Sequence, residues 1–225
     1  VGVAFAMNIL IVIPARGGSK GIPRKNLRKL NDKPLIYYSI KTALSLECKP
    51  DVYVSSDDDE IIYTANLLGA KTHKRDPNIA NDTATLDPVI YACYQYAKAM
   101  EGKDYDLVVT AQPTSPLLKT KTLDSAIRQI ADNSEVDTLI AAKDNTHLSW
   151  KKVGKKFKPN YTERVNRQHL EPIFTETGAF FISRSRCVTQ TNRIGNNVDL
   201  FVLSHDEDID IDTYDDWNLC EYYLK

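Results

Sequence analysis

The chain has 225 residues, of which 42% are apolar, so it is long enough to bury a sizeable core in one α/β domain. Its 29 basic and 30 acidic residues leave a net charge of −1. This balance excludes the overall positive field that draws proteins to nucleic acid or to anionic membranes. We therefore expect neither nucleic acid nor a membrane as a partner, and any anion site must be local.

Cysteine usage and the short apolar runs indicate a cytoplasmic protein. The cysteines are Cys48, Cys93, Cys187 and Cys220. They show no C-x-x-C spacing, which argues against a zinc ribbon or a disulfide scaffold and is typical of a reducing compartment. The apolar run from Ile9 to Ile13 is too short to span a bilayer. Residues 1–6 precede Met7 and are interpreted as an artificial or upstream remnant, so the expected domain is 7–225.

From Asn8 onward, short β-rich runs alternate with longer amphipathic segments. This pattern predicts an α/β fold with a mostly parallel sheet, three-layered and Rossmann-like, in which crossover helices cover both faces. Strands are expected at 8–13, 51–55, 106–111, 136–142, 178–183 and 199–204. Helices are expected from Pro34 to about 44, at 57–68, 85–100, 120–131 and 214–224.

The alternation breaks between residues 145 and 175, where the chain is polar and irregular. Trp150, Val153 and Phe157 are spaced like one face of a hairpin, so we expect this segment to be an inserted arm. An isolated hairpin is marginally stable in water. We therefore expect the arm to contact a twofold-related copy, which predicts a homodimer.

The segment from Pro14 to Asn26 reads P-A-R-G-G-S-K-G-I-P-R-K-N and follows a hydrophobic strand. Glycines let the backbone approach an anion and expose its N–H groups, and nearby cations neutralise several phosphate oxygens at once. The sequence therefore predicts a triphosphate site here. Neither G-x-x-x-x-G-K-[ST] nor G-x-G-x-x-G fits the segment, so kinase, GTPase and dinucleotide-dependent oxidoreductase hypotheses lose their support. The cations of the loop are Arg16, Lys20, Arg24 and Lys25, and its glycines are Gly17, Gly18 and Gly21.

Near the end of the chain, Asp208, Asp210 and Asp212 alternate with two isoleucines. In a strand, this spacing would point the three carboxylates to one face. Adjacent carboxylates repel, and a divalent cation bound between them and substrate phosphates offsets that cost. We expect Mg²⁺, or Mn²⁺ in its place. An alternative is that Asp212 or Thr213 only caps the last helix.

Taken together, these motifs resemble those of the acylneuraminate cytidylyltransferases, or CMP-sialic acid synthetases. The similarity extends over nearly the whole chain from Met7. The matching segments are Ala15 to Asn26, Ser55-Ser56-Asp57-Asp58, Arg75, Asp82-Thr83, Gln112 to Pro116, Arg167-Gln168, Thr177 to Phe180 and Ile209 to Thr213.

The resemblance implies a role for each matching residue. Nucleotide binding is implied for Ala15, Arg16, Gly17, Gly18, Ser19, Lys20, Lys25, Asn26, Arg75, Thr83 and Thr85. Sugar binding is implied for Gln112, Thr114, Arg167 and Gln168. Metal binding is implied for Asp210 and Asp212, and direct participation in catalysis for Arg16, Lys20, Arg167 and Asp210.

The family reaction would couple CMP from CTP to a nine-carbon acidic sugar of the N-acylneuraminate type, with release of pyrophosphate. No general base is indicated. Deaminated neuraminate, legionaminate and pseudaminate stay open as sugars, whereas the opening loop disfavours the eight-carbon 3-deoxy-manno-octulosonate. A non-catalytic nucleotide-sugar binding module is the alternative from another class, and the carboxylate pair argues against it because binding alone does not need a metal site.

Overall fold

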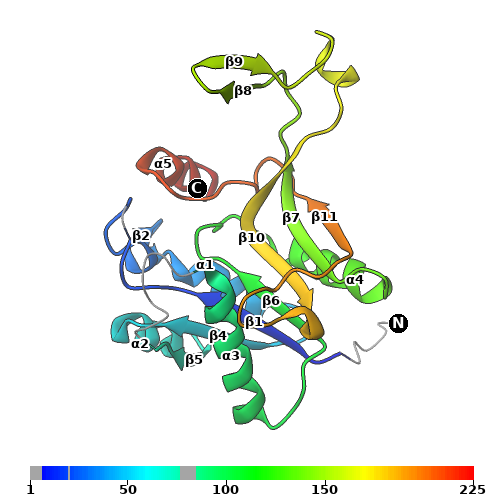
Figure 1. Ribbon diagram of the computed structural model, residues 1–225. Coiled ribbons are helices and arrows are strands. Elements are labelled where there is room, and N and C mark those ends of the chain that lie inside the picture. Colours follow the sequence, from blue (N-terminus) through cyan, green and yellow to red (C-terminus); the bar gives the residue numbers. More distant parts are fainter. Residues whose placement is uncertain (1–6, 20, 77–84) are drawn as a thin grey trace.

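The computed structural model of the chain describes residues 7–19, 21–76 and 85–225, which form a seven-stranded sheet, helices around it and a projecting arm (Figure 1). The strands are β1 (Ile9–Pro14), β2 (Lys29–Leu30), β3 (Lys33–Pro34), β4 (Asp51–Ser56), β5 (Lys71–Lys74), β6 (Leu107–Ala111), β7 (Thr138–Asp144), β8 (Trp150–Val153), β9 (Lys156–Pro159), β10 (Phe174–Arg184) and β11 (Val198–Val202). The helices are α1 (Ile36–Leu44), α2 (Asp59–Leu67), α3 (Leu86–Glu101), α4 (Thr120–Asp132) and α5 (Tyr214–Tyr223), with 3-10 turns η1 (Lys25–Leu27), η3 (Arg167–His169) and η4 (Ser185–Cys187).

The order of strands in the main sheet is β11-β7-β10-β6-β1-β4-β5. β10 runs antiparallel to β6 and β7, while the remaining neighbours pair in parallel. The mostly parallel α/β sheet expected from the alternation is confirmed. β6, β1 and β4 lie side by side, so the segments that follow Pro14, Ser56 and Ala111 leave the same edge. Ligands bind at this edge in open parallel sheets.

The layers follow from the two-residue period of the strands. Ile9, Ile11 and Ile13 of β1 pack in one buried cluster with residues of α1, α2 and α4. Leu10 and Val12 point to the other face and pack with residues of α3. Successive side chains of a strand point to opposite faces, so a fully apolar strand needs cover on both. The three-layer architecture is therefore present.

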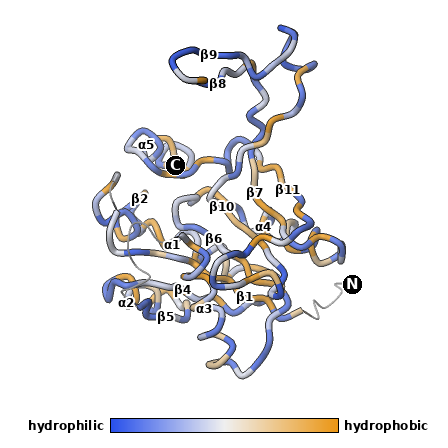
Figure 2. Tube along the Cα trace, in the orientation of Figure 1, coloured by the Kyte–Doolittle hydropathy of each residue, from blue (hydrophilic) through white to orange (hydrophobic). Residues whose placement is uncertain are grey.

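The arm leaves the sheet after β7 and returns through β10, and its β8–β9 hairpin lies away from the body of the molecule (Figure 1). Every residue of β8 and β9 is exposed, and this stretch is largely hydrophilic (Figure 2). Trp150 pairs with Pro159 and Lys152 with Phe157. This register places Trp150 and Phe157 on one face and Val153 on the other, so the single apolar face expected for the hairpin is wrong.

Three local expectations also need correction. The helix expected from Pro34 begins at Ile36, because Pro34 belongs to the small β2–β3 hairpin. β5 has only the polar sequence Lys-Thr-His-Lys and was not expected as a strand; its pairing with β4 makes it the edge of the sheet. Residues 208–212 form no strand in the structure. The strands expected at 136–142, 178–183 and 199–204 are present with shifted ends.

Among the residues that the structure describes, no helix is both long enough and apolar enough to span a bilayer.

Candidate active site

A cavity of about 240 Å³ lies where the loop after β1 meets the segment after β6 and the residues that precede α5. It brings together positions nearly 200 residues apart in the sequence. The cavity is lined by Pro14, Arg16, Gly18, Ser19, Lys25, Asn26, Arg75, Leu86, Gln112, Pro113, Thr114, Asp210 and Asp212.

The first half of the Gly-rich loop is held by the segment that follows β4. The backbone N–H of Gly17 donates to Oδ1 of Asp57 at 3.1 Å. A Cβ on Gly17 would lie 2.6 Å from Oδ2 of Asp58, so a residue larger than glycine would displace the loop. Gly17 and Ala15 do not line the cavity, whereas Gly18 and Ser19 do. The nucleotide contacts predicted for Gly17 would therefore have to replace an internal hydrogen bond.

Arg24 differs from the other cations of the loop that the structure describes. Its two guanidinium nitrogens contact Asp58 at 3.1 Å and Glu60 at 2.5 Å, and it does not line the cavity. Asp58 caps α2 by accepting from the N–H groups of Glu60 and Ile61. Burial alone would raise the pKa of Asp58, but the N–H of Ile61 and the charge of Arg24 hold it below its usual value. Arg24 thus fastens the loop to α2 and does not face a phosphate.

Lys25 and Asn26 enter the cavity from η1. The side-chain amide of Asn26 donates to the carbonyl oxygen of Arg16 at 2.9 Å, which ties the two halves of the loop together. Lys25 donates to the carbonyl oxygen of Ile211, and its Nζ lies 3.5 Å from Oδ1 of Asp212. Its side chain is only 13% exposed. The loop therefore packs directly on the segment that carries the carboxylate pair.

Arg75 reaches the cavity from the end of β5 and is buried, with 5% of its surface exposed. One guanidinium nitrogen donates to the carbonyl oxygen of Ser55 at 2.8 Å, and Nε has no partner within the described residues. Burial lowers the pKa of Arg75; the charge of Asp57 opposes that shift, and the charge of Arg16 adds to it. A buried guanidinium beside a second cation is poised to bind an anion.

Asp210 and Asp212 also line the cavity. Burial raises the pKa of Asp210 and the charge of Asp212 adds to that shift, while the nearby Thr114 hydroxyl acts against it. Oδ1 of Asp210 is buried and has no hydrogen-bond partner in the part of the chain described. A Cβ on Gly178 would lie 2.8 Å from Oδ2 of the same carboxylate, so glycine there makes room for it. Asp208, by contrast, contacts His205 and does not line the cavity.

An unpartnered buried carboxylate oxygen next to a second carboxylate fits a divalent cation with oxygen ligands. Among the described residues, no group of three or more His, Cys, Asp or Glu side chains is placed to hold a metal. Two carboxylates are nevertheless enough for Mg²⁺, which usually keeps several waters and completes its shell with substrate phosphates. The residues therefore fit the predicted ion. Thr213, not Asp212, caps α5, so the helix-cap alternative for Asp212 is wrong.

The predicted sugar ligands fall into two places. Gln112 and Thr114 line the main cavity. Arg167 and Gln168 lie in the arm and line a separate hollow of about 430 Å³ with Asp144 and Phe174. Arg167 is 3.5 Å from Asp144 and largely exposed. Within one chain, the structure does not join Arg167 to the other predicted catalytic residues.

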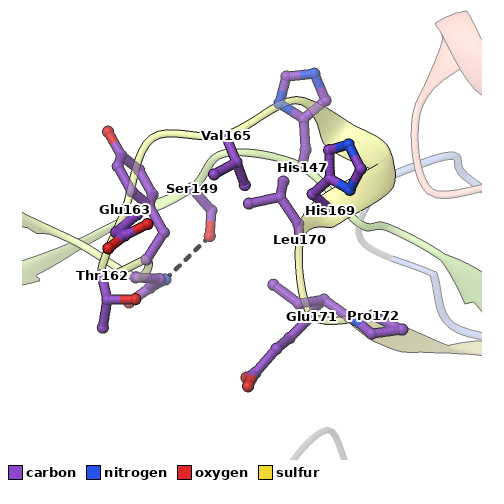
Figure 3. Close-up of a pocket in the computed structure, with 12 residues that line it drawn as sticks. His147, Ser149, Thr162, Glu163, Val165, His169, Leu170, Glu171 and Pro172 are labelled. Carbon is purple, nitrogen blue, oxygen red and sulfur yellow. Dashed lines mark hydrogen bonds between the residues drawn. The ribbon is translucent and has the colours of Figure 1, made fainter.

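The arm also contains a hollow of about 410 Å³, whose lining includes His147, His169 and Glu171 (Figure 3). Its lining holds none of the residues predicted for the site. Lys20 and Thr83, both predicted nucleotide ligands, lie outside the described residues. Thr85 is exposed immediately before α3 and does not line the main cavity.

Sequence reasoning did not assign Asp57 and Asp58 a role in holding the loop. It identified the segment from Asp57 to Glu60 as the start of a helix, and Asp57 and Asp58 as part of a segment that matches the family, without a role for either side chain. The available signal was that Asp57 follows a buried strand adjacent to β1, at the edge where the loop begins.

The site combines a Gly-rich loop, the cations Lys25 and Arg75 and two carboxylates, at the carboxyl edge of a three-layer α/β sheet. This arrangement is typical of a nucleotide-binding α/β protein. The family model for cytidylyltransferases matches residues 10–213, and the chain belongs to this family.

Relatives within the family differ in the sugar that their names state. The chain is 32% identical to the pseudaminic acid cytidylyltransferase of Campylobacter jejuni over 97% of both chains. It is 33% identical to the CMP-N,N'-diacetyllegionaminic acid synthase of Legionella pneumophila, again over 97% of both. The N-acylneuraminate cytidylyltransferase A of Danio rerio is 30% identical over 95% of this chain, which spans 50% of that protein's length.

The fold is similar to that of a solved CMP:2-keto-3-deoxy-manno-octonic acid synthetase complexed with CTP. The two share a TM-score of 0.71 over 96% of this chain and 98% of the other, at 15% sequence identity. At this identity the likeness shows the fold alone, and it agrees with the three-layer architecture.

Proposed function

We propose that this chain transfers CMP from CTP to the anomeric hydroxyl of a nine-carbon acidic sugar. The hydroxyl oxygen forms a bond to the α-phosphorus, the bond between that phosphorus and the bridging oxygen of the β-phosphate breaks, and pyrophosphate leaves. The hydroxyl proton passes to solvent. The observation that carries the proposal is that one cavity holds the cations of the Gly-rich loop and the unpartnered carboxylate oxygen of Asp210. The names of the three relatives support the same reaction class.

The chain's own groups act by positioning and by charge. Arg16, Lys25 and Arg75 line the cavity and would neutralise the triphosphate, whose charge grows on the leaving pyrophosphate. Asn26 holds the backbone of Arg16, which orients the N–H groups of the loop. Lys20 is proposed as a further phosphate ligand on the family resemblance. Asp210 and Asp212 would hold Mg²⁺ or Mn²⁺, which when bound supplies positive charge beside the α-phosphate.

Gln112 and Thr114 are proposed to contact the sugar, because both present hydrogen-bonding groups to the cavity without adding charge. Arg167 is proposed to bind the sugar carboxylate, for which a guanidinium is the best matched partner. Since Arg167 lies in the projecting arm, we propose that the arm of one copy supplies it to the cavity of a second copy in a homodimer. Two-stranded hairpins need such cover to be stable.

N-acylneuraminate is our first choice of sugar, because the Lys20-Gly21 step resembles the sialate and legionaminate branches of the family. Deaminated neuraminate, legionaminate and pseudaminate are the other nine-carbon candidates, and 3-deoxy-manno-octulosonate is the least favoured. We place the reaction in the cytoplasm, where CTP is available; the free thiols of all four cysteines are compatible with this proposal.

The experiment is pyrophosphate release from CTP and Mg²⁺ with each of these acidic sugars in turn, and with ATP and UTP as nucleotide controls. We expect release with CTP and at least one nine-carbon acid. Release with the octulosonate alone would reassign the sugar. If no sugar supports release although CTP binds in a calorimetric titration, the chain is a binding module and the proposed reaction is wrong.

A further inference from the structure

Glu207 is a buried carboxylate that the reaction proposed above does not use. It lies in the segment that leads from β11 to α5 across one end of the sheet (Figure 1), and only 3% of its surface is exposed. It does not line the cavity. A carboxylate is costly to bury unless donors and positive charge compensate it. The surroundings of Glu207 must therefore supply both.

The compensation comes from the first turn of α4. Oε2 of Glu207 accepts from the backbone N–H of Lys119 at 3.1 Å, and Oε1 accepts from the hydroxyl of Thr122 at 2.9 Å. The ammonium of Lys119 lies 3.3 Å from Oε1. Lys119 is the N-cap of α4, and its own side chain caps nothing. A helix N-terminus favours a negative charge and a hydrogen-bond acceptor. Glu207 provides both to the N-terminus of α4, although it lies 85 or more residues from Lys119 and Thr122 in the sequence.

This anchor stands three residues before Asp210, on a segment without regular structure. Residues 203–213 form neither helix nor strand, so no ladder of backbone hydrogen bonds sets their path. On the far side of Asp210, the N–H of Ile211 donates to the carbonyl oxygen of Thr114 at 2.8 Å, and the Ile211 side chain is fully buried beside Trp217. Asp210 therefore lies between two fixed points, Glu207 and Ile211.

We propose that Glu207 is a positioning residue for the carboxylate pair: by fastening the chain to α4, it sets where Asp210 meets a divalent cation. The proposal rests on the proposed function and deepens it. The backbone hydrogen bond of Ile211 fixes the chain after Asp210, and before Asp210 the partly buried Ile209 packs against the same cluster as Ile211. Without Glu207, the chain from Ser204 to Asp208 would lose its hydrogen bonds to α4, and ordering it would then cost conformational entropy each time a cation binds.

The test compares Glu207→Gln with wild type by Mn²⁺ titration, followed by electron paramagnetic resonance, of the protein saturated with CTP. Glutamine keeps the shape but presents an amide NH₂ where the carboxylate accepted. We expect Mn²⁺ binding to weaken about tenfold or more, as for other groups that orient metal ligands. The Mg²⁺ concentration for half-maximal pyrophosphate release should rise in parallel, while the KM for CTP at saturating Mg²⁺ stays within about twofold.

Asp206→Asn is the matched control. Asp206 contacts the ammonium of the same Lys119 at 2.5 Å but is half exposed and does not reach the backbone of α4. It should leave Mn²⁺ binding unchanged. An equal loss in both variants would show a general effect of negative charge and overturn the proposal. So would Mn²⁺ binding by Glu207→Gln that equals wild type, whatever happens to its melting temperature, because Glu207 would then only cap a helix.

If Glu207→Gln does not fold, a second pair of variants tests the positioning role of Glu207. Thr122→Val removes one donor to Glu207, and Thr122→Ser restores it. We expect valine to weaken Mn²⁺ binding and serine to recover it; identical binding by both overturns the proposal. The proposed function is tested separately in the same preparations. Wild type that binds Mn²⁺ and CTP but releases no pyrophosphate would contradict the reaction and leave the positioning role of Glu207 standing.

Discussion

The ammonium of Lys25 lies 3.5 Å from a carboxylate oxygen of Asp212 and donates to the carbonyl oxygen of Ile211. This contact joins the Gly-rich loop after the first strand to the segment before the last helix. The two halves of the candidate site are therefore a single packed unit. A substitution in one half should therefore alter the geometry of the other.

Lys25→Ala tests this unit directly. It removes a cation that lines the cavity, for which we propose phosphate binding, and also the hydrogen bond to Ile211, so we expect kcat/KM to fall by roughly 10²-fold or more. Lys25→Arg should recover little, since the guanidinium cannot occupy the 13% exposed position of the ammonium without moving the loop. Steady-state pyrophosphate release measures both. Lys98→Ala, which breaks the ion pair of Lys98 on α3 with Asp104 in the following segment, is the control and should behave as wild type. Activity of Lys25→Ala close to wild type would contradict the assignment.

Asp210→Asn should abolish activity and stabilise the metal-free protein. Burial raises the pKa of Asp210, so the native state holds this proton to a higher pH than the unfolded state does, and stability falls as pH rises through that interval. At neutral pH the charged carboxylate therefore costs stability, which the amide removes. Each 1 kcal/mol regained corresponds to a rise of roughly 2–4 °C in melting temperature for a chain of this size.

Calorimetry in chelator measures that rise, and pyrophosphate release measures the loss of turnover. Asp208→Asn is the control, because Asp208 contacts His205 and does not line the cavity. It should retain activity within about twofold. A melting temperature of Asp210→Asn below that of wild type would show that the carboxylate is satisfied in the native state.

Two glycines of the loop should differ in their response to substitution by alanine. A Cβ on Gly21 would lie 2.6 Å from the carbonyl oxygen of Asp212, whereas a Cβ on Gly18 meets no heavy atom within 4 Å. Gly21→Ala must push two backbones apart, which typically costs about 1–3 kcal/mol. We expect a lower melting temperature for Gly21→Ala and an unchanged one for Gly18→Ala. Equal melting temperatures would mean that the loop and the Asp212 segment move apart freely.

His73 should make stability sensitive to acid. It is buried on β5, with Nδ1 3.0 Å from the hydroxyl of Ser55, and burial lowers its pKa, with the charge of Arg75 acting in the same direction. The unfolded state therefore takes up a proton first as pH falls below about 6.5, and stability is lost from there downward. His73→Gln does not titrate in this range. We expect its melting temperature to fall less steeply between pH 7 and 5 than that of wild type, and parallel curves would contradict a neutral buried His73.

Complementation tests whether the arm acts on a second copy. Arg167→Ala and Asp210→Asn should each be inactive alone. If dimers form at random in a co-expressed mixture, half are mixed, and each mixed dimer has one site with both groups intact. About a quarter of wild-type activity should then return. Activity no greater than the sum of the two separate variants would place Arg167 in its own chain's site, and sedimentation as a monomer would exclude the arrangement altogether.

Local sequence predicted the elements whose signals are strong. The continuous apolar strands around Ile11 and Val109 and the helix that begins after Thr85 lie where expected, since short apolar runs and helical spacing are properties of short segments. β5 was missed because its four residues are polar. Its strand conformation is imposed by pairing with β4, and only His73 among its residues is buried.

The sequence likewise predicted some features of the candidate site and not others. The chemistry of the loop from Pro14 to Asn26 and of the Asp210-Asp212 pair could be read from residue types and spacing. Residue types and spacing did not show which of the loop's cations faces the cavity. Arg24 and Lys25 are adjacent in sequence, yet one contacts Asp58 and the other Asp212.

By itself, then, the sequence determined an α/β sheet whose first strand is followed by a Gly-rich basic loop, and it predicted phosphate binding for that loop and a cation site for the Asp210-Asp212 pair. The tertiary structure decided which groups share the cavity, that Glu207 and Ile211 bracket Asp210, and that Arg167 stands apart in the arm. The physical reason is the distance along the sequence over which each interaction acts. Backbone propensity and periodicity act over a few residues, whereas the direction of a charged side chain is set by partners brought together across the fold, here up to 187 positions away.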